Sequence, residues 1–280
     1  MKIRFEGAFI PYGCYWSTPF VRWQGSFGHL HPIEFAAEVA RRALAERGIP
    51  AETFDELVLG MTVPAKHSFF GPPWLAGLIG CPGITGPLVS QACATAACVV
   101  AHAAAKVAGG GAGAVLTITC DKTSNGPHIY YPNPLGPGGK GESEDWVWDN
   151  FNCDPYAGNA MVETAENVAR SAEISWEEQD RVTLLRYEQY KAALADGGAF
   201  QRRYMVLPIE VKDPTGRKVV VTVAGDEGVY PTTAEGLARL KPVLEGGTIT
   251  YGTQTHPADG NCGLVVATRD RAADWPGTRG

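Results

Sequence analysis

The chain has 280 residues, of which 45% are hydrophobic and 19% charged, and its formal net charge is −6. This length and apolar fraction suffice for one large domain, or two smaller ones, with a packed core. The negative charge and the lack of a basic run argue against a nucleic-acid-binding surface. Nothing resembles a signal peptide, and no apolar run reaches membrane-spanning length without Gly, Pro or charge.

The seven cysteines also limit the class of protein. They are odd in number and stand mostly in apolar surroundings, which indicates reduced thiols and predicts a cytoplasmic location. No Cys-x-x-Cys pair is present, so we expect no zinc or other metal site in this chain.

The first part of the chain alternates predicted strands and helices, which favours an α/β fold with a mostly parallel mixed sheet. Strands are predicted over residues 2–10, 55–63, 84–89 and 114–120, and helices over 31–47, 73–79 and 94–108. The last of these helices contains almost only Ala, Val, Cys and Thr. A helix that is apolar nearly all round is typically buried.

The pattern changes after residue 120. Residues 121–160 are rich in Gly, Pro, Asn and aromatic residues, and so long a loop in a compact domain is usually functional. Two helices are predicted next, over 161–172 and 175–195, the second with Ser175 and Glu178 as a capping box. Strands are then predicted over 205–211 and 218–223, and over 247–251 and 264–268, where the chain returns to the sheet.

Cys93 is the most informative single residue, because it lies where a predicted strand gives way to the alanine-rich helix. The first turn of a helix carries unpaired N–H groups and the positive end of the helix dipole, which favour a thiolate over a thiol. Cys93 is therefore a candidate nucleophile. From the residues alone, the alternative that it is a small buried hydrophobic residue, as we expect for Cys98, is equally favoured.

Motifs downstream of Cys93 favour the nucleophile. They are the glycine run 109–113, the segment 121–128 that ends in Pro-His, Thr164-Ala-Glu-Asn, Glu178-Gln-Asp and Gly247-Thr-Ile-Thr. In this order they resemble the N-terminal half of a thiolase, over about residues 2–270. The resemblance implies a layered α/β/α half with a buried helix after the nucleophile and an inserted α+β loop domain. The implied division is a core over 1–121, the loop domain over 122–246 and a return to the core over 247–280.

The second half of a thiolase is predicted to be absent. Thiolases carry a Gly-His-Pro histidine, a cysteine in Cys-x-Gly and an asparagine in Asn-Glu-x-Phe in that half, and none of these motifs occurs here. The resemblance implies that Cys93 carries an acyl group during thiolysis of 3-oxoacyl-CoA or the reverse Claisen condensation, with its own backbone N–H as one oxyanion donor. Whether the chain is an enzyme by itself therefore stays open. Coenzyme A is a substrate here, and no cofactor is expected.

Coenzyme A contacts follow from the same resemblance. Met161, Tyr251, Gly252 and Thr255 fall where thiolases line the pantetheine channel. Two departures from the family pattern are Ala160, where a histidine is usual, and Thr253-Gln-Thr-His, where Asn-Ala-Ser-Gly is usual. They resemble divergent thiolases, some of which work with a small zinc-ribbon, OB-fold partner protein. Candidate cations for the nucleotide end, or simply solvated loop charges, are Arg202, Arg203, Arg217 and Lys218.

Other residues are weaker candidates. His128 is expected to be structural, and His29 with His31 fit a loop at a helix start better than a metal site. We expect an aromatic group in the long loop to line an acyl pocket rather than only to pin the loop: Trp146, Trp148, Phe151 and Tyr156.

Three functions remain at this point. The first is a thiolase-type acyltransferase completed by a C-terminal half from elsewhere, working with acyl-CoA and coenzyme A. The second is another condensing enzyme of the ketoacyl synthase type. The third is a non-catalytic half that binds acyl-CoA or a partner. Because half of a doubled fold exposes the flank of residues 94–108, we expect the chain to form homo-oligomers or to bind its complementary half.

Overall fold

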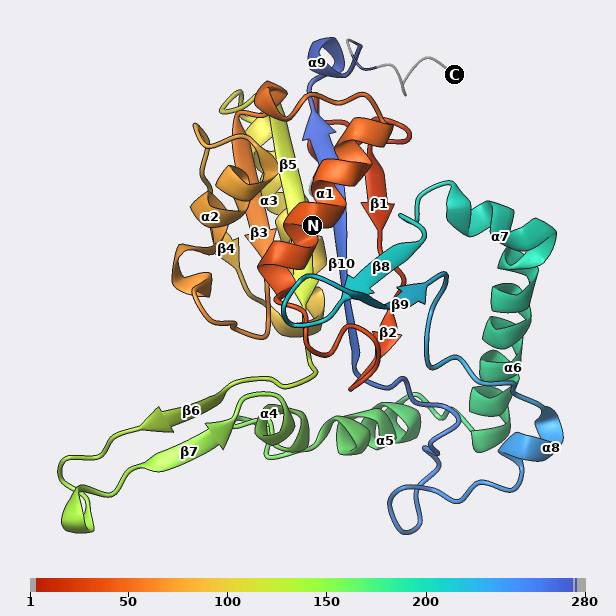
Figure 1. Ribbon diagram of the computed structural model, residues 1–280. Helices are drawn as coiled ribbons and strands as arrows, with labels where there is room; N and C mark the ends of the chain where they lie inside the picture. The colour runs from red at the N-terminus through yellow and green to blue at the C-terminus, as the bar shows by residue number, and fades with distance from the viewer. Residues whose placement is uncertain (1–3, 274, 276–280) are drawn as a thin grey trace. The chain divides into compact units, whose positions relative to one another are not determined.

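The computed structural model describes residues 4–273 and 275, and the chain divides into two compact units. The first unit comprises residues 1–125, 202–227 and 258–280, and the second comprises 126–201 and 228–257 (Figure 1). This division differs from the predicted one in two places. Residues 202–227 belong with the core, and residues 247–257 belong with the inserted unit rather than with the returning chain.

A mixed sheet forms the centre of the first unit, with strand order β1-β10-β5-β3-β4 and β2 paired to β10. Its strands are β1 Tyr15–Ser17, β2 Val21–Arg22, β3 Glu56–Gly60, β4 Leu88–Val89, β5 Ala114–Asp121 and β10 Ala258–Ala267. Strands β4, β3 and β5 are parallel, as expected. Strand β10 runs antiparallel to β5, β1 and β2, so the sheet is mixed but not mostly parallel.

Two helices cover opposite faces of this sheet. Successive side chains of a strand point to opposite faces, so each face has apolar side chains for a helix to cover. Helix α1, Pro32–Glu46, packs on Leu57, Leu59 and Leu116. Helix α3, Thr95–Ala108, packs on Val58 and Val115 from the other face. The predicted α/β/α layering is confirmed (Figure 1). The remaining helical segments of this unit are η1 Ala51–Thr53, η2 Ser68–Phe70, α2 Gly71–Ile79, η3 Ala92–Ala94 and α9 Arg269–Ala273.

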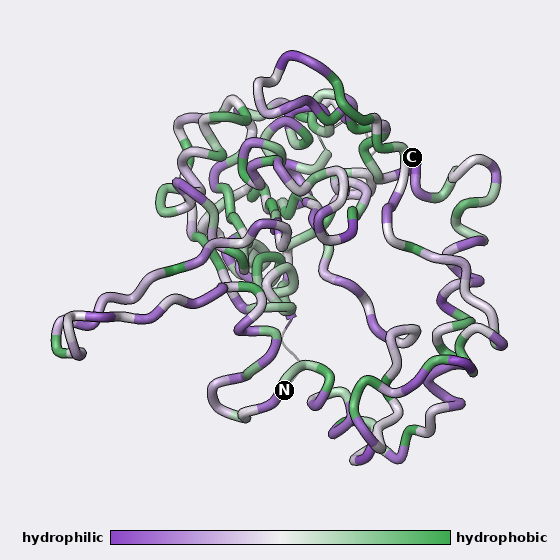
Figure 2. The backbone as a smooth tube through the Cα atoms, turned by 60° about the horizontal axis from the view of Figure 1, so that its bottom comes forward, coloured by the Kyte–Doolittle hydropathy of each residue, from purple (hydrophilic) through white to green (hydrophobic). Residues whose placement is uncertain are grey.

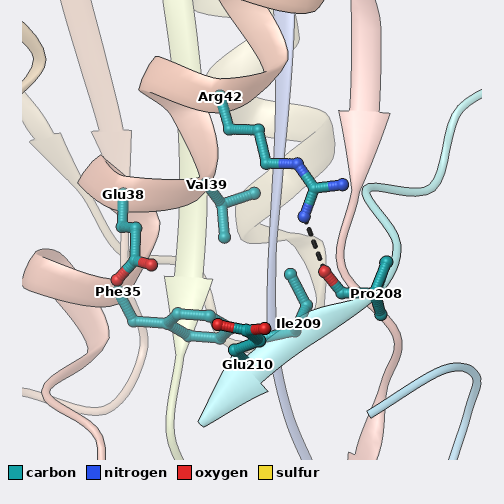
Figure 3. Close-up of a pocket in the computed structure, with 7 residues that line it drawn as sticks. All are labelled: Phe35, Glu38, Val39, Arg42, Pro208, Ile209 and Glu210. Atoms are coloured by element: carbon teal, nitrogen blue, oxygen red, sulfur yellow. Dashed lines mark hydrogen bonds between the residues drawn. The ribbon is translucent and has the colours of Figure 1, made fainter. Parts of the chain in front are cut away.

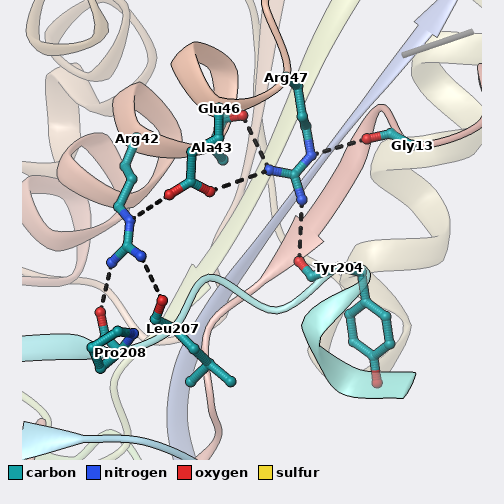
Figure 4. Close-up of polar contacts among 8 residues, drawn as sticks. All are labelled: Gly13, Arg42, Ala43, Glu46, Arg47, Tyr204, Leu207 and Pro208. Carbon is teal, nitrogen blue, oxygen red and sulfur yellow. Dashed lines mark hydrogen bonds and ion pairs between the residues drawn. The ribbon is translucent and has the colours of Figure 1, made fainter. Parts of the chain in front are cut away.

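Helix α1 also holds the hairpin of β8, Ile209–Lys212, and β9, Val219–Val223, to the core. Arg42 donates to the carbonyls of Leu207 and Pro208, at 2.5 and 2.6 Å, and Arg47 donates to those of Gly13 and Tyr204, at 2.9 and 3.4 Å (Figure 4). These bonds explain why residues 202–227 belong to the first unit. Sequence periodicity does not report such long-range contacts.

The second unit is a small α+β assembly. It contains β6 His128–Tyr131, η4 Pro137–Gly139, β7 Glu142–Asp145, α4 Trp148–Asn152, α5 Met161–Ser171, α6 Trp176–Ala193, α7 Ala195–Arg202 and α8 Ala234–Leu237. The last residue of α7, Arg202, already belongs to the first unit. Strands β6 and β7 pair as an antiparallel hairpin, which is mainly hydrophilic, whereas many of the hydrophobic stretches lie in the first unit (Figure 2). Ser175 caps α6 and accepts a hydrogen bond from the Glu178 amide, as the capping motif predicts.

Three expectations about single elements are wrong. Residues 4–10 contribute the bridge of Phe9 to Ala267 in place of the predicted strand, whose residues 2–3 lie outside the described range. Residues 247–251 do not join the sheet; Thr250 forms a bridge to Pro242 instead. Helix α3 is buried on one side only, because the described chain places nothing over its other side.

Among the residues that the structure describes, no helix has the length and apolarity to cross a membrane. Over the same residues, no three His, Cys, Asp or Glu side chains gather in a way that could hold a metal ion.

Candidate active site

Cys93 is exposed and lies in η3, a single 3-10 turn between β4 and α3. Ala92, just before it, has a φ of +43°. A non-glycine residue rarely adopts this left-handed conformation, and it persists only where neighbouring contacts enforce it. The chain therefore makes a sharp turn that presents Cys93 two residues ahead of Thr95, the first residue of α3.

The enforcing contacts centre on the buried side chain of Thr95. Its hydroxyl accepts a hydrogen bond from the Gln91 amide at 2.8 Å and donates one to the Ala92 carbonyl at 2.7 Å. The Thr62 hydroxyl lies 3.1 Å from that of Thr95 and 3.2 Å from the Ala92 carbonyl oxygen. The hydroxyls of Thr62 and Thr95 thus both bond the carbonyl of Ala92, the residue with the left-handed conformation.

Asp121, at the end of β5, supports this arrangement from behind. One of its carboxylate oxygens accepts from the amides of Thr62 and Val63, at 2.8 and 2.9 Å. Burial raises the pKa of the Asp121 carboxyl, and the two amides oppose that shift. The Thr62 segment is fixed in this way against the end of the sheet.

Gly60, the last residue of β3, lets α3 approach the sheet closely. A Cβ atom at this position would lie 2.8 Å from a methyl carbon of Val99 and 2.9 Å from methyl carbons of Thr95 and Thr119. No side chain larger than hydrogen fits without movement of the helix. The close approach packs the methyl group of Thr95 against β3.

Cys93 differs from the other cysteines in its exposure and position. Burial raises the pKa of four thiols, those of Cys14, Cys81, Cys120 and Cys262. Cys98 is half-buried, and its thiol donates to the side-chain oxygen of Gln91. Cys153 is exposed, but it follows the short helix α4 rather than preceding a long one. Cys93 alone among the seven is both exposed and next to the N-terminus of a 14-residue helix.

The second unit brings three sequence motifs together at one residue, Thr248. Glu166, buried in α5, accepts from the amides of Thr248 and Ile249, each at 2.7 Å, and from the Thr248 hydroxyl at 3.1 Å. Gln179 of α6 donates to the same hydroxyl at 3.0 Å. Burial opposes ionisation of Glu166, but the Ile249 and Thr248 amides hold the pKa of its carboxyl below the ordinary value. A Cβ at Gly247 would lie 2.4 Å from a Glu166 oxygen, which explains the glycine.

The four residues expected to contact coenzyme A all lie in the second unit. Met161 is the first residue of α5 and is 42% exposed, and Tyr251 is 78% exposed in the turn that follows Thr250. Gly252 has a packing role: a Cβ there would lie 2.5 Å from Leu237. The Thr255 hydroxyl donates to the His256 carbonyl at 3.2 Å. Glu166 therefore joins the helix that begins at Met161 to the segment that presents Tyr251.

The weaker candidates have other surroundings. The Nε2 atoms of His29 and His31 lie 2.7 and 2.8 Å from the carbonyl oxygens of Lys212 and Lys66, and His31 precedes α1 as its N-cap. His128 is in β6, 3.7 Å from an Asp145 carboxylate oxygen. Three of the aromatic residues of the long loop are exposed: Trp148, Phe151 and Tyr156. The four loop cations are exposed as well: Arg202 ends α7, Arg203 follows it, and Arg217 and Lys218 precede β9.

A cavity of about 210 Å³ lies between α1 and β8, with Glu38, Arg42 and Glu210 in its wall (Figure 3). Helix α1 covers the sheet face opposite to α3. Cys93, at the start of α3, therefore does not face this cavity, and the cavity contributes nothing to the candidate site.

Comparison with known proteins assigns the chain to a family. The family described as thiolase, N-terminal domain, matches residues 16–270, and the chain belongs to it. The acetyl-CoA acetyltransferase of Yarrowia lipolytica is 26% identical over 92% of this chain and 63% of its own length. That of Paracoccus denitrificans is 30% identical over 91% of this chain and 65% of its own.

The fold is shared with solved thiolases. The human mitochondrial 3-ketoacyl-CoA thiolase, crystallised with CoA, matches 97% of this chain and 67% of its own with a TM-score of 0.83 and 25% identity. The predicted thiolase-like fold is confirmed. The chain spans less than two thirds of the length of the curated relatives it matches.

Sequence reasoning identified Cys93 but missed the residues that shape its turn. Thr95 stands two residues after Cys93, and Asp121 comes directly after a predicted strand, so both were in view. A side chain that bonds across a turn leaves no periodic signal. The spacing Cys-x-Thr at a helix start, where Thr is a favoured capping residue, was the available hint.

Proposed function

We propose that this chain is the acyl-accepting half of a thiolase-type acyl-CoA acyltransferase, with Cys93 as the nucleophile. The observation that carries the proposal is the strained turn that exposes Cys93 at the start of α3 in a member of the thiolase family. The names of the relatives, acetyl-CoA acetyltransferase and 3-ketoacyl-CoA thiolase, support the reaction class.

In the proposed half-reaction, the Cys93 thiolate attacks the thioester carbonyl of an acyl-CoA. A bond forms between the Cys93 sulfur and the acyl carbon, the bond from that carbon to the coenzyme A sulfur breaks, and coenzyme A leaves as a thiolate that takes a proton from solvent. The Cys93 amide serves as one oxyanion donor. Thiolysis of a 3-oxoacyl-CoA, or the reverse condensation, needs a further acid and base, which we assign to a C-terminal half outside this sequence.

Coenzyme A is proposed to bind through the second unit, with Met161, Tyr251, Gly252 and Thr255 along the pantetheine. The exposure of Met161 and Tyr251 leaves both side chains accessible to a ligand. Gly252 has no side chain, and the nearby Leu237 leaves no room for one, so it would contact the pantetheine through its backbone. No cofactor is required by this chemistry.

We propose a complementary thiolase half as the main partner. Helix α3 presents a side of small apolar residues that the described chain leaves exposed: Ala96, Ala97, Ala101 and Ala105. A second helix can pack closely on such a surface. Assembly into homo-oligomers, a small zinc-ribbon, OB-fold partner and a cytoplasmic location remain proposals from the resemblance; the seven free cysteines are compatible with a reducing compartment.

Isotope exchange tests the proposed half-reaction. Acetyl-CoA is incubated with the protein and coenzyme A labelled in its nucleotide, and label in the acetyl-CoA pool is followed by mass spectrometry. We expect slow exchange in the wild type, because acylation and its reversal need only Cys93, and loss of exchange in Cys93→Ala. Equal exchange in both proteins would refute Cys93 as the nucleophile.

A non-catalytic half is the second candidate, favoured by the exposed side of α3. It predicts binding of acyl-CoA without exchange. The ketoacyl synthase alternative is not retained, because the family match is to thiolases over residues 16–270.

A further inference from the structure

We propose that Thr95 is a positioning residue for Cys93, and that its hydroxyl rather than its bulk performs this role. The inference rests on the proposed function, since it names what keeps that nucleophile in place. Thr95 does not touch substrate in this account and acts only through the turn that carries Cys93.

One oxygen of Thr95 makes two hydrogen bonds to the turn that carries Cys93. The Thr95 hydroxyl accepts from the Gln91 amide at 2.8 Å and donates to the Ala92 carbonyl at 2.7 Å. The Gln91 amide belongs to the residue before Ala92, and the carbonyl is that of Ala92 itself, the residue with a φ of +43°. A single hydroxyl therefore bonds the peptide group directly after the strained residue and the amide of the residue before it, and both bonds are lost if the turn relaxes.

The orientation of this hydroxyl is itself determined by packing. Threonine is branched at Cβ and has few favoured rotamers. The Thr95 methyl carbon faces Gly60, where a Cβ would approach it to 2.9 Å, and the side chain is 6% exposed. With the methyl group held against β3, the hydroxyl points to the turn. Gly60 and Thr95 thus form one device that joins the sheet to the Cys93 turn.

The location of Cys93 explains why the turn matters for reactivity. The favourable effect of a helix N-terminus on a thiolate decays within the first turn of the helix. Relaxation at Ala92 would move Cys93 relative to the start of α3. The same relaxation would let the Cys93 thiol adopt other positions, for example one near the Gln91 side chain that the Cys98 thiol contacts.

The experiment measures alkylation of individual cysteines by iodoacetamide between pH 6 and 9, read by peptide mass spectrometry. Cys153, exposed in the second unit, is the internal reference. In Thr95→Val, which keeps the shape and removes the hydroxyl, we expect the Cys93 rate at neutral pH to fall about fivefold relative to that of Cys153. Thr95→Ser, which keeps the hydroxyl, should stay within about twofold of the wild type.

Thr117→Val is the matched control. Thr117 is a buried threonine of β5 whose hydroxyl donates to the Leu264 carbonyl at 2.9 Å, away from the Cys93 turn. It should leave Cys93 alkylation unchanged. An unchanged Cys93 rate in Thr95→Val, or an equal fall in Thr95→Ser or Thr117→Val, would overturn the proposal. Because alkylation needs no acyl-CoA, a wild type that fails in label exchange but shows this pattern would refute the proposed function alone.

Discussion

At the scale of single residues, one side chain organises each candidate region: a hydroxyl in the first unit and a carboxylate in the second. Thr95 holds the turn before Cys93, and Glu166 holds the segment before Tyr251. Thr95 bonds the Gln91 amide and the Ala92 carbonyl, and Glu166 bonds the Thr248 amide and the amide of the buried Ile249. Leaving such a group unpaired costs about 1–3 kcal/mol.

Glu166→Gln should destabilise the second unit by about 1–3 kcal/mol, because the glutamine nitrogen cannot accept the Thr248 hydroxyl and the neutral amide oxygen binds the Thr248 and Ile249 amides more weakly than a carboxylate oxygen does. Hydrogen exchange of those two amides is the direct measurement, and both should exchange faster. The control is Glu188→Gln, which removes an exposed ion pair to Lys191 at 2.7 Å. Unchanged protection of the Ile249 amide in Glu166→Gln would contradict the account.

The pH dependence of stability follows from the lowered pKa of Glu166. In the unfolded chain a glutamate has a pKa of about 4.3. The folded value is lower, so the stabilisation is fully present above about pH 4.3 and is lost as the pH falls through the folded value. Urea unfolding of the wild type should therefore show a decline below about pH 4.3 that is smaller in Glu166→Gln. Parallel curves for the two proteins would exclude this role.

At the scale of elements, β3 and α3 are matched through Gly60. Gly60→Ala should destabilise the first unit by about 1–3 kcal/mol, because the added carbon meets Val99, Thr95 and Thr119 at 2.8–2.9 Å. It should also slow alkylation of Cys93, since it displaces the first turn of α3. Thermal unfolding and peptide mass spectrometry are the measurements.

Gly77→Ala is the control for that prediction. Gly77 lies in α2 with nothing within 4 Å of an added Cβ, so alanine should be neutral or stabilise by up to about 1 kcal/mol. A Gly60→Ala protein as stable as Gly77→Ala would show that α3 does not pack on β3 as described.

The elements differ in how well the sequence predicted them, and the reason is physical. Helices α1, α5 and α6 carry local signals, such as the Ser175 cap, and their ranges agree with prediction. Strand β1, Tyr15–Ser17, is too short to show alternation and exists because β10 pairs with it. The hairpin β8–β9 joins the core through Arg42, a contact between residues more than 160 positions apart.

The candidate site divides in the same way. Cys93 could be predicted, because its place at a helix start and the thiolase-like motifs are sequence features. The turn at Ala92 and its Thr95, Thr62 and Asp121 contacts could not, because they depend on three separate segments meeting at one edge of the sheet. The meeting of Glu166, Gln179 and Thr248 explains afterwards why those motifs occur together.

At the scale of the whole molecule, the exposed side of α3 predicts association. Sedimentation velocity of the purified chain should show self-association or aggregation in place of a stable monomer, because small apolar residues are left uncovered. Ala97→Glu places a charge on this side and should shift the distribution toward monomer, whereas Gln189→Glu on α6 should not. A wild type that stays monomeric at all concentrations would contradict the proposed partner surface.

The central claim, that Cys93 carries the acyl group, is tested most directly by peptide mass spectrometry after incubation with acetyl-CoA. The account predicts an acetyl group on Cys93 that free coenzyme A removes, with none on Cys153, which is equally classed as exposed but lacks the helix. Cys93→Ala should carry no acetyl-thioester. Equal acetylation of Cys93 and Cys153, or none on Cys93 while Cys153 reacts, would contradict it.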